Sequence, residues 1–151
     1  MNYTVKLISI ETFFSYKHID SLLQEYSDES KGALVPVVKT DIVLYKTLED
    51  LGILDLIVVY DDEVIVGFIS LMTTVMPHYS EKASTVESIF VLKEHRKFGT
   101  GKILIGKAES IAKDKDAKAM FMSAPKNGVL SKVVGTYGFT ETNTIYAKKI
   151  V

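Results

Sequence analysis

Two apolar, β-branched runs separated by an acidic turn constrain the fold of this chain most strongly. Residues 54–60 (LDLIVVY) form the first run, Asp61 and Asp62 follow it, and residues 64–72 (VIVGFISLM) form the second. Runs of this length and composition predict buried strands, and the short connection predicts a hairpin. Gly67, inside the second run, indicates a bulge or a close approach of another backbone. The sequence therefore predicts an antiparallel pair of buried strands.

Further strands and helices are predicted on both sides of this hairpin. Alternating residues predict a strand at 3–7, and apolar stripes at helical spacing predict helices at 19–26, 44–51, 104–112 and 130–137. Thr40 or Asp41 can cap the second helix, and Gly52 can take the left-handed position after its end. Additional strands are expected at 85–93, 118–124 and 140–150. Interleaved strands and helices in a chain of this length predict one mixed α/β domain, residues 1–151.

Composition excludes several classes of function. The chain has no cysteine, which rules out disulfides, thiolate metal sites and a cysteine nucleophile. Its three histidines are far apart in sequence, so we expect no metal site. Lys and Arg total 18 against 19 Asp and Glu, whereas a duplex nucleic-acid binder needs a basic excess. No run is long and apolar enough to span a membrane, and no signal peptide is evident, which predicts a cytoplasmic protein.

Positive charge nevertheless gathers around one turn. Residues 86–102 (VESIFVLKEHRKFGTGK) predict a strand, a short turn containing Gly99 and Gly101, and a helix that begins directly afterwards. Glycines let a backbone approach a ligand closely, and the unpaired N–H groups and dipole of a helix N-terminus favour an anion such as pyrophosphate. The alternatives are a tight turn without a ligand, or nucleic-acid binding by the basic cluster. The basic residues are Lys93, His95, Arg96, Lys97 and Lys102.

Two common phosphate-binding loops do not fit this segment. A Walker A loop needs Ser or Thr after its Gly-Lys pair, but Ile103 follows Lys102, and Arg96 stands where that loop has an earlier glycine. A dinucleotide-binding fingerprint needs a third glycine where Leu104 stands. Neither a P-loop nor a Rossmann site is therefore expected.

The same segment resembles the acetyl-coenzyme A (acetyl-CoA) loop of the GNAT superfamily, whose pattern is Arg/Gln-x-x-Gly-x-Gly/Ala. Arg96, Gly99 and Gly101 match it position for position, with a predicted strand before them and a helix after them. The family resemblance implies an α/β (α+β) fold with a central mixed, mostly antiparallel twisted sheet flanked by about four helices. Proteins of this fold often pair through their terminal strands, so the resemblance implies a homodimer as one candidate assembly.

A second GNAT pattern, Asn-x-x-Ala-x-x-x-Tyr-x-x-x-Gly-Phe, is matched in part after the next strand. Asn127, Gly138 and Phe139 stand in register, whereas Leu130 and Val134 occupy the Ala and Tyr positions. In element order the resemblance covers nearly the whole chain. From residue 78 to residue 148 the chain looks most like the small acetyltransferases common in bacteriophage genomes.

The resemblance implies an acetyl-CoA-dependent N-acetyltransferase, in which a primary amine of a small molecule or protein attacks the thioester directly. Residues of the strand before the loop would line the pantetheine arm, and backbone N–H groups of the loop would hold the pyrophosphate. Asn127 would lie near the far side of the cofactor. The implied cofactor-binding residues are thus Ile89, Phe90, Val91, Arg96, Lys97, Phe98, Gly99, Thr100, Gly101, Lys102 and Asn127.

Catalysis needs a base, because an alkyl amine with a pKa near ~10.4 must lose a proton before it attacks. Glu87 stands where family members often carry a glutamate, so it is the predicted base, and His78 is the second candidate. Glu87 as a solvent-facing strand residue is the competing interpretation. Val134 replaces the tyrosine that protonates the leaving thiolate in many members, which leaves the acid unassigned. A protein that binds acetyl-CoA or a partner without turnover is therefore the alternative function.

Overall fold

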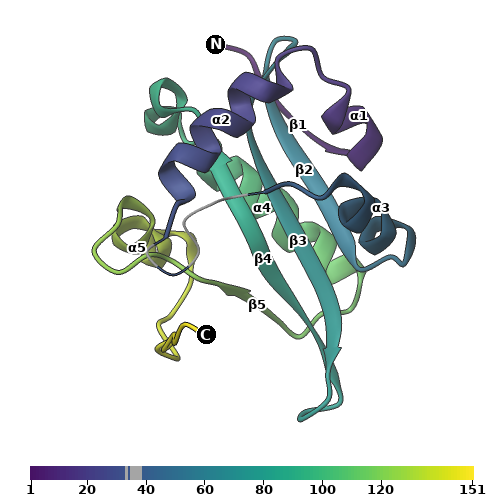
Figure 1. The fold of residues 1–151 in the computed structure, drawn as a ribbon, viewed down its shortest axis with the longest axis vertical. Coiled ribbons are helices and arrows are strands. Elements are labelled where there is room, and N and C mark those ends of the chain that lie inside the picture. Colours follow the sequence, from purple (N-terminus) through teal and green to yellow (C-terminus); the bar gives the residue numbers. More distant parts are fainter. Residues whose placement is uncertain (33, 35–38) are drawn as a thin grey trace.

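The computed structural model describes residues 1–32, 34 and 39–151. Its five strands form one sheet in the order β1-β2-β3-β4-β5. The first four are antiparallel to their neighbours, and β5 is parallel to β4 (Figure 1). The strands are β1 (Tyr3–Ile8), β2 (Leu54–Asp61), β3 (Val64–Met76), β4 (Glu81–Val91) and β5 (Ala119–Met122). The predicted hairpin is confirmed as β2 and β3, and the sheet is mixed and mostly antiparallel, as expected.

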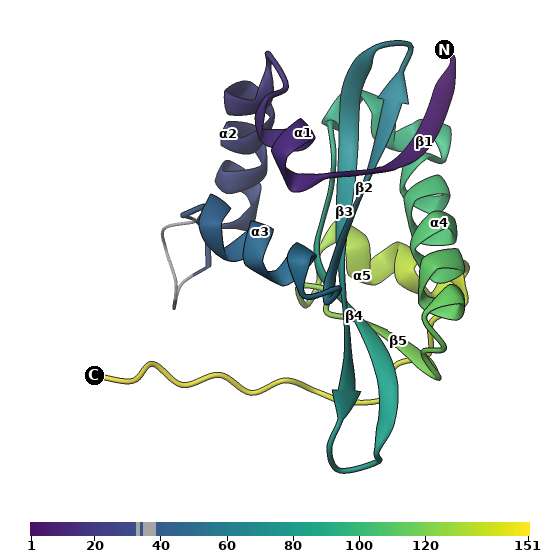
Figure 2. The same cartoon turned by 90° about the vertical axis from the view of Figure 1, so that its right-hand side faces the viewer.

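Helices cover both faces of this sheet (Figure 2). On one face lie α1 (Ile10–Phe14), α2 (Ile19–Ser30) and α3 (Ile42–Asp50), and on the other lies α4 (Thr100–Asp114). A 3-10 helix, η1 (Lys93–Phe98), joins β4 to α4. After β5 the chain forms α5 (Val129–Val133) and a second 3-10 helix, η2 (Val134–Tyr137). No helix of the described residues is both long and apolar enough to cross a membrane.

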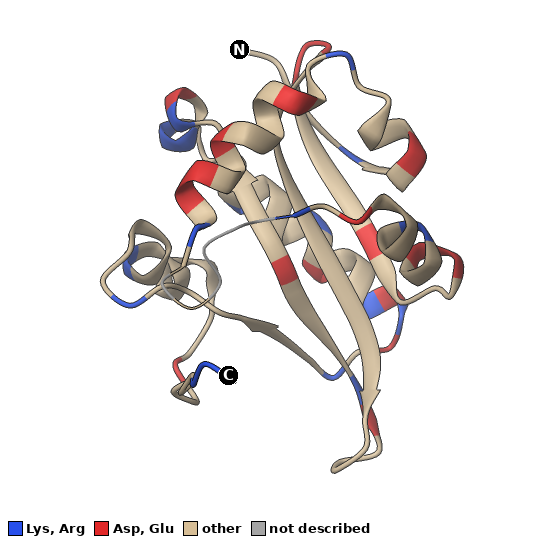
Figure 3. Ribbon diagram, in the orientation of Figure 1, with Lys and Arg blue, Asp and Glu red and all other residues tan. Residues whose placement is uncertain are grey.

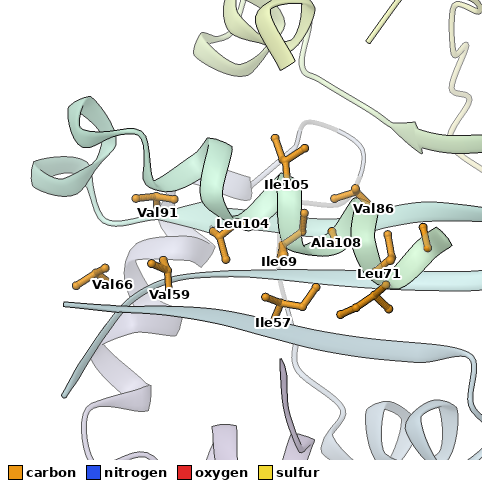
Figure 4. Packing of buried hydrophobic residues seen from close by; sticks show 12 residues of the cluster. Ile57, Val59, Val66, Ile69, Leu71, Val86, Val91, Leu104, Ile105 and Ala108 are labelled. Atoms are coloured by element: carbon orange, nitrogen blue, oxygen red, sulfur yellow. The ribbon is translucent and has the colours of Figure 1, made fainter. Parts of the chain in front are cut away.

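Each face of the sheet has its own apolar cluster. Under α4, Leu104 and Ala108 pack on Ile57 and Ile69 of the two central strands (Figure 4). The opposite cluster is rich in aromatic residues and includes Phe68 of β3. Because β2 and β3 are covered on both sides, successive side chains are buried in turn on opposite faces, which explains their unbroken apolar sequence.

Two local predictions are confirmed in detail. Asp41, rather than Thr40, caps α3, since its carboxylate accepts a hydrogen bond from the Leu44 N–H at 3.0 Å, and Gly52 has a left-handed φ of 71°. Gly67 marks a close backbone approach, because a Cβ there would lie 2.8 Å from the Phe90 carbonyl oxygen. The neighbouring pairing of β2 with β3 also shifts register, between Val59 and Tyr60.

One helix was missed, two predicted strands need correction, and the predicted helix at 130–137 is divided into α5 and the 3-10 helix η2. Helix α1 was not expected, because five residues are too few to show a helical period, although Ser9 caps it by accepting from the Thr12 N–H. Strand β4 spans Glu81–Val91 instead of 85–93. The predicted terminal strand at 140–150 does not form, and residues 140–151 are exposed. Ile145 and Tyr146 are adjacent, so this run lacks the single apolar face that would hold it on a sheet.

Candidate active site

Strands β4 and β5 run together for only a short distance and then diverge. They pair from Ala83 and Ala119 to Val86 and Met122. Strand β4 then continues to Val91, and its pairing with β5 does not extend past Val86. A strand edge of this kind presents backbone N–H and C=O groups that an extended ligand can pair with. In the part of the chain that the structure describes, no strand pairs with this edge of β4 at residues 87–91, and this free edge is therefore a candidate slot for a linear, amide-containing molecule.

The side chains of residues 89–91 on this edge contribute to the hydrophobic core rather than to the slot. Phe90 is buried in the aromatic cluster beside α2, and Val91 is buried in the cluster under α4. Ile89 is partly buried and packs against the α4 cluster. Any contact that these three predicted residues make with a ligand in the slot would thus come mainly from their backbone.

A β-bulge sets the direction of Glu87. Ser88 pairs with Ser70 and Val86 pairs with Leu71, so Glu87 has no partner residue on β3. An extra residue of this kind interrupts the alternation of side chains along the strand. Val86 faces the α4 cluster, whereas Glu87 and Ser88 both reach hydroxyl groups on the face covered by α1–α3. Without the bulge, Glu87 and Ser88 would point to opposite faces.

The Glu87 carboxylate accepts a hydrogen bond at each of its two oxygens. The Tyr45 hydroxyl, from α3, donates to Oε1 at 2.9 Å, and the Ser70 hydroxyl, from β3, donates to Oε2. The Ser70 and Ser88 hydroxyl oxygens are 2.8 Å apart. Glu87 is solvent-accessible, yet it is held from two directions. Glu87 is thus exposed on its strand, as the competing interpretation expects, but its carboxylate is also held by side chains of α3 and β3.

The environment keeps Tyr45 in its protonated, donating form. Burial raises the pKa of its phenol above the usual value, and the negative charge and hydrogen bond of Glu87 raise it further. The pKa of Tyr26 is also raised, by burial first and by the charge of Glu87 second. Both tyrosines line a small cavity of about 30 Å³, together with Phe14, Ser70 and other residues of the α1–α3 face. Protonated hydroxyl groups and aromatic rings thus converge beside one carboxylate.

The glycine turn forms at the start of α4 as predicted. Gly99 ends η1 in the left-handed conformation with a φ of 77°, and α4 begins at Thr100. The Ile103 N–H bonds to the Gly99 carbonyl, so the N–H groups of residues 100–102 belong to the first turn, which has no intrahelical acceptors. Thr100 is fully buried, and its hydroxyl donates to the His95 carbonyl oxygen at 2.8 Å. This bond fixes η1 against the start of α4.

The Arg96 side chain has a role that the sequence pattern does not reveal. Its Nε donates to the Val91 carbonyl oxygen at 2.8 Å, and its Nη2 lies 2.6 Å from Glu29 of α2. The guanidinium also lies 5.6 Å from the centre of the Phe90 ring. Arg96 therefore anchors η1 to β4 and α2, and any contribution to anion binding would come from its backbone. Figure 3 shows the basic residues of η1 beside the acidic residues of α2.

The other predicted loop residues lie at or near the surface. Lys97 is exposed, with its ammonium 5.4 Å from the centre of the Phe98 ring, and Phe98 is itself exposed. Lys102 is exposed in the first turn of α4. Tyr137, at the end of η2, also reaches this turn: a Cβ on Gly101 would lie 3.4 Å from its hydroxyl oxygen.

The structure separates His78 from the rest of the site. His78 is exposed in the turn between β3 and β4, with its ring centroid 4.7 Å from that of Tyr79. From Glu81, just after this turn, to Glu87 the strand is roughly 20 Å long. His78 and Glu87 therefore cannot act on the same reacting atom.

Asn127 lies between β5 and α5 with a φ of 61°. Asn127 could also have capped the helix that follows it, but the N-cap of α5 is Gly128, which offers no side-chain bond, so Asn127 does not cap this helix. A larger cavity of about 310 Å³ lies between α4, β5 and η2, and none of its lining residues is a predicted site residue. Among the described residues, no group of three His, Asp or Glu side chains could hold a metal ion.

Comparison with known families identifies the class of protein that this fold and turn define. Residues 18–142 match the model of the acetyltransferase (GNAT) family. The chain therefore belongs to the GNAT family of acetyltransferases. A search of curated proteins found no match.

Solved structures show the same fold at low sequence identity. An aminoglycoside acetyltransferase from an uncultured soil metagenomic sample, in complex with sisomicin, is 12% identical with a TM-score of 0.77, over 99% of this chain and 97% of that chain. Glucosamine-6-phosphate N-acetyltransferase from Arabidopsis thaliana is 12% identical with a TM-score of 0.76, over 100% of both chains. Ribosomal-protein-alanine N-acetyltransferase from Brucella melitensis is 18% identical with a TM-score of 0.68, over 100% of this chain and 99% of that chain. The names of these proteins point to different acceptors, so the likeness establishes the fold and not the acceptor.

Proposed function

We propose that the protein transfers the acetyl group of acetyl-CoA to a primary amine, with Glu87 as the general base. The observation that carries this proposal is the continuity of three features along one stretch of chain. The bulge presents the Glu87 carboxylate, the free edge of β4 follows it, and the glycine turn opens α4. A base, a slot for an extended arm and a site for an anion thus follow one another in the order that such a donor requires.

The residues of this chain fit the donor through their backbone. Apart from the Val91 carbonyl oxygen, which accepts from Arg96 Nε, the free edge of β4 at residues 87–91 offers backbone hydrogen-bonding groups to the amides of the pantetheine arm. The first-turn N–H groups of α4, next to the left-handed Gly99, suit a pyrophosphate. Once bound, acetyl-CoA supplies an activated thioester whose acetyl carbon an amine can attack. Asn127 is retained as a proposed contact on the far side of the slot.

Glu87 supplies the proton acceptor that the amine needs. At neutral pH an alkyl amine is an ammonium ion, and its lone pair becomes available only when a base removes a proton. A carboxylate has about four acceptor positions, of which Tyr45 and Ser70 occupy two, so positions remain for the amine. His78 is too far along the β3–β4 hairpin to share this role. The acceptor is an amine of a small molecule, peptide or protein.

Donor binding is tested by calorimetry with acetyl-CoA. Gly101→Glu places a negative charge in the first turn of α4, where the added Cβ meets only the Tyr137 hydroxyl. Gly106→Glu is the matched control, because Gly106 is an exposed residue of the same helix with open space around it. We expect micromolar affinity for the wild type and for Gly106→Glu, and at least a tenfold loss for Gly101→Glu. Folded wild-type protein that does not bind acetyl-CoA contradicts the proposal.

Turnover is tested by measuring free coenzyme A with a thiol reagent over a panel of amines. The chain contains no cysteine, so the protein itself adds no thiol background. We expect Glu87→Gln to lower kcat by about 100-fold or more, the usual contribution of general-base catalysis. Unchanged kcat in Glu87→Gln would remove Glu87 from the mechanism.

Binding of acetyl-CoA without turnover is the second candidate function. It is favoured by Val134, which stands at the start of η2 where the family pattern has a tyrosine and which cannot donate a proton. Tight binding in calorimetry combined with no thiol release from any amine would select this function.

A further inference from the structure

The hydrogen bonds around Glu87 have a fixed direction. A carboxylate can only accept, so the Tyr45 and Ser70 hydroxyls must both donate to it. Ser70 has one hydroxyl proton, which is committed to Glu87. The contact between the Ser70 and Ser88 hydroxyls, at 2.8 Å, therefore requires Ser88 to be the donor. The chain of donation is Ser88 to Ser70 to Glu87, with Tyr45 donating from the other side.

These donors restrain the carboxylate from two independent parts of the fold. Ser70 lies on β3, directly beside the bulge, and Tyr45 lies on α3, 42 residues before Glu87 in the sequence. A glutamate side chain otherwise rotates freely at a surface, and fixing it costs entropy that the two bonds offset. Hydrogen bonds to an ionised group are shorter and stronger than neutral ones. Each oxygen of Glu87 therefore has a defined position.

We propose that Tyr45 and Ser70 are positioning residues, which hold the Glu87 carboxylate in the orientation that accepts the proton of the acceptor amine. This inference rests on the proposed function, because it gives these residues a role in the same reaction. It makes α3 part of the catalytic apparatus, although α3 has no buried residue and contributes only partly buried side chains to the core. Tyr45 links the helix to the site through a single hydroxyl group.

The kinetic test removes each donor with the smallest possible change. We expect Tyr45→Phe and Ser70→Ala each to lower kcat by about tenfold, with the KM for acetyl-CoA unchanged, since a charge-assisted hydrogen bond is lost and the donor slot is untouched. Ser88→Ala keeps the Ser70 to Glu87 bond and should remain within about threefold of wild type. Tyr79→Phe, on the exposed β3–β4 turn, is the matched tyrosine control and should match wild type.

A double variant separates positioning from an unrelated effect. If Tyr45 acts through Glu87, adding Tyr45→Phe to Glu87→Gln should lower kcat by less than about twofold further, because the group it orients is already gone. A further tenfold loss, or wild-type kcat in both Tyr45→Phe and Ser70→Ala, overturns the inference. An inactive wild type overturns the proposed function as well, whereas an active wild type with an inactive Glu87→Gln and normal donor variants overturns the inference alone.

Tyrosine titration followed by NMR tests the contact without any substrate. In protein labelled with ¹³C at the tyrosine ring, the Tyr45 signal should stay in its protonated position as pH rises past the ordinary tyrosine pKa of about 10. Glu87→Gln removes the negative charge and should lower the pKa of Tyr45 towards that value. Identical Tyr45 titration in wild type and Glu87→Gln would show that the two groups do not interact, which overturns the inference.

Discussion

The two faces of the sheet are built in different ways. The face under α4 is packed mainly with aliphatic side chains, and the turn that opens α4 is defined by neighbouring residues of one segment. The face under α1–α3 combines aromatic rings with the Tyr45–Glu87–Ser70–Ser88 network, whose members come from three separate elements. The proposed donor site thus depends on local backbone geometry, whereas the proposed base depends on long-range side-chain contacts. The first should tolerate most side-chain changes, and the second should not.

The α4 face should show the largest loss of stability. Leu104 is fully buried against the central strands, so Leu104→Ala leaves a cavity and should lower the free energy of unfolding by about 2–5 kcal/mol. Leu44→Ala on α3 is the control, because Leu44 is 53% exposed and its truncation should cost less than about 0.5 kcal/mol. Urea denaturation measures both. Equal losses would show that α4 does not pack as described.

The close backbone approach of β3 and β4 at Gly67 should be the next most sensitive point for stability. Gly67→Ala places a Cβ 2.8 Å from the Phe90 carbonyl oxygen, a backbone atom that cannot move away alone. We expect a loss of about 1–3 kcal/mol in the free energy of unfolding, the usual cost of overpacking. Gly106→Ala, in open space on α4, should instead stabilise the protein by up to about 1 kcal/mol. A neutral Gly67→Ala would mean that the strands separate easily.

The cap of α3 offers a smaller change that should affect only one face. Asp41→Ala removes the bond to the Leu44 N–H and should cost about 1 kcal/mol of stability. Tyr45 lies in the same first turn, so we also expect a lower kcat with unchanged affinity for acetyl-CoA in calorimetry. Weaker acetyl-CoA binding by Asp41→Ala would show that the two faces are coupled.

Alkaline pH should lower the free energy of unfolding through the two tyrosines of the α1–α3 face. The folded-state pKa values of Tyr26 and Tyr45 are raised, so the unfolded chain releases these phenolic protons first. The stability that the two tyrosines contribute is fully present below the ordinary tyrosine pKa of about 10 and is lost as pH rises through their folded-state values. Urea midpoints measured at rising pH should therefore fall above about pH 10, and less steeply in Tyr45→Phe than in wild type. An unchanged slope in Tyr45→Phe would contradict the raised pKa.

The sequence could predict what short, contiguous patterns determine. The β2–β3 hairpin follows from two β-branched runs, and the turn at Gly99 follows from glycine spacing and the charges around it. The partners of Glu87 could not be predicted in this way, because Tyr45 and Ser70 stand 42 and 17 residues away and carry no motif. The ion pair of Arg96 with Glu29, 67 residues away, could not be predicted for the same reason.

Two errors also have physical causes. Helix α1 is shorter than the window over which a helical period can be recognised. The expected terminal strand rested on an alternating sequence, but alternation alone supplies no neighbouring edge, and two adjacent apolar residues leave this run without one buried face. Local signals thus identified the longer helices and strands, and failed for a five-residue helix and for the C-terminal run.

The number of residues in β4 determines on which face of the sheet the Glu87 carboxylate lies, because of the bulge. Between Val86 and Ser88 the strand carries one residue more than its partner, and this odd residue is Glu87. Removing Val86, for example, would restore regular pairing with β3 and place Glu87 opposite Leu71, whose side chain lies in the cluster under α4. A chain of otherwise identical composition would then keep its glutamate and its glycine turn but lose the alignment between them. Insertions and deletions in β4 should therefore be far more damaging to activity than substitutions of the same residues.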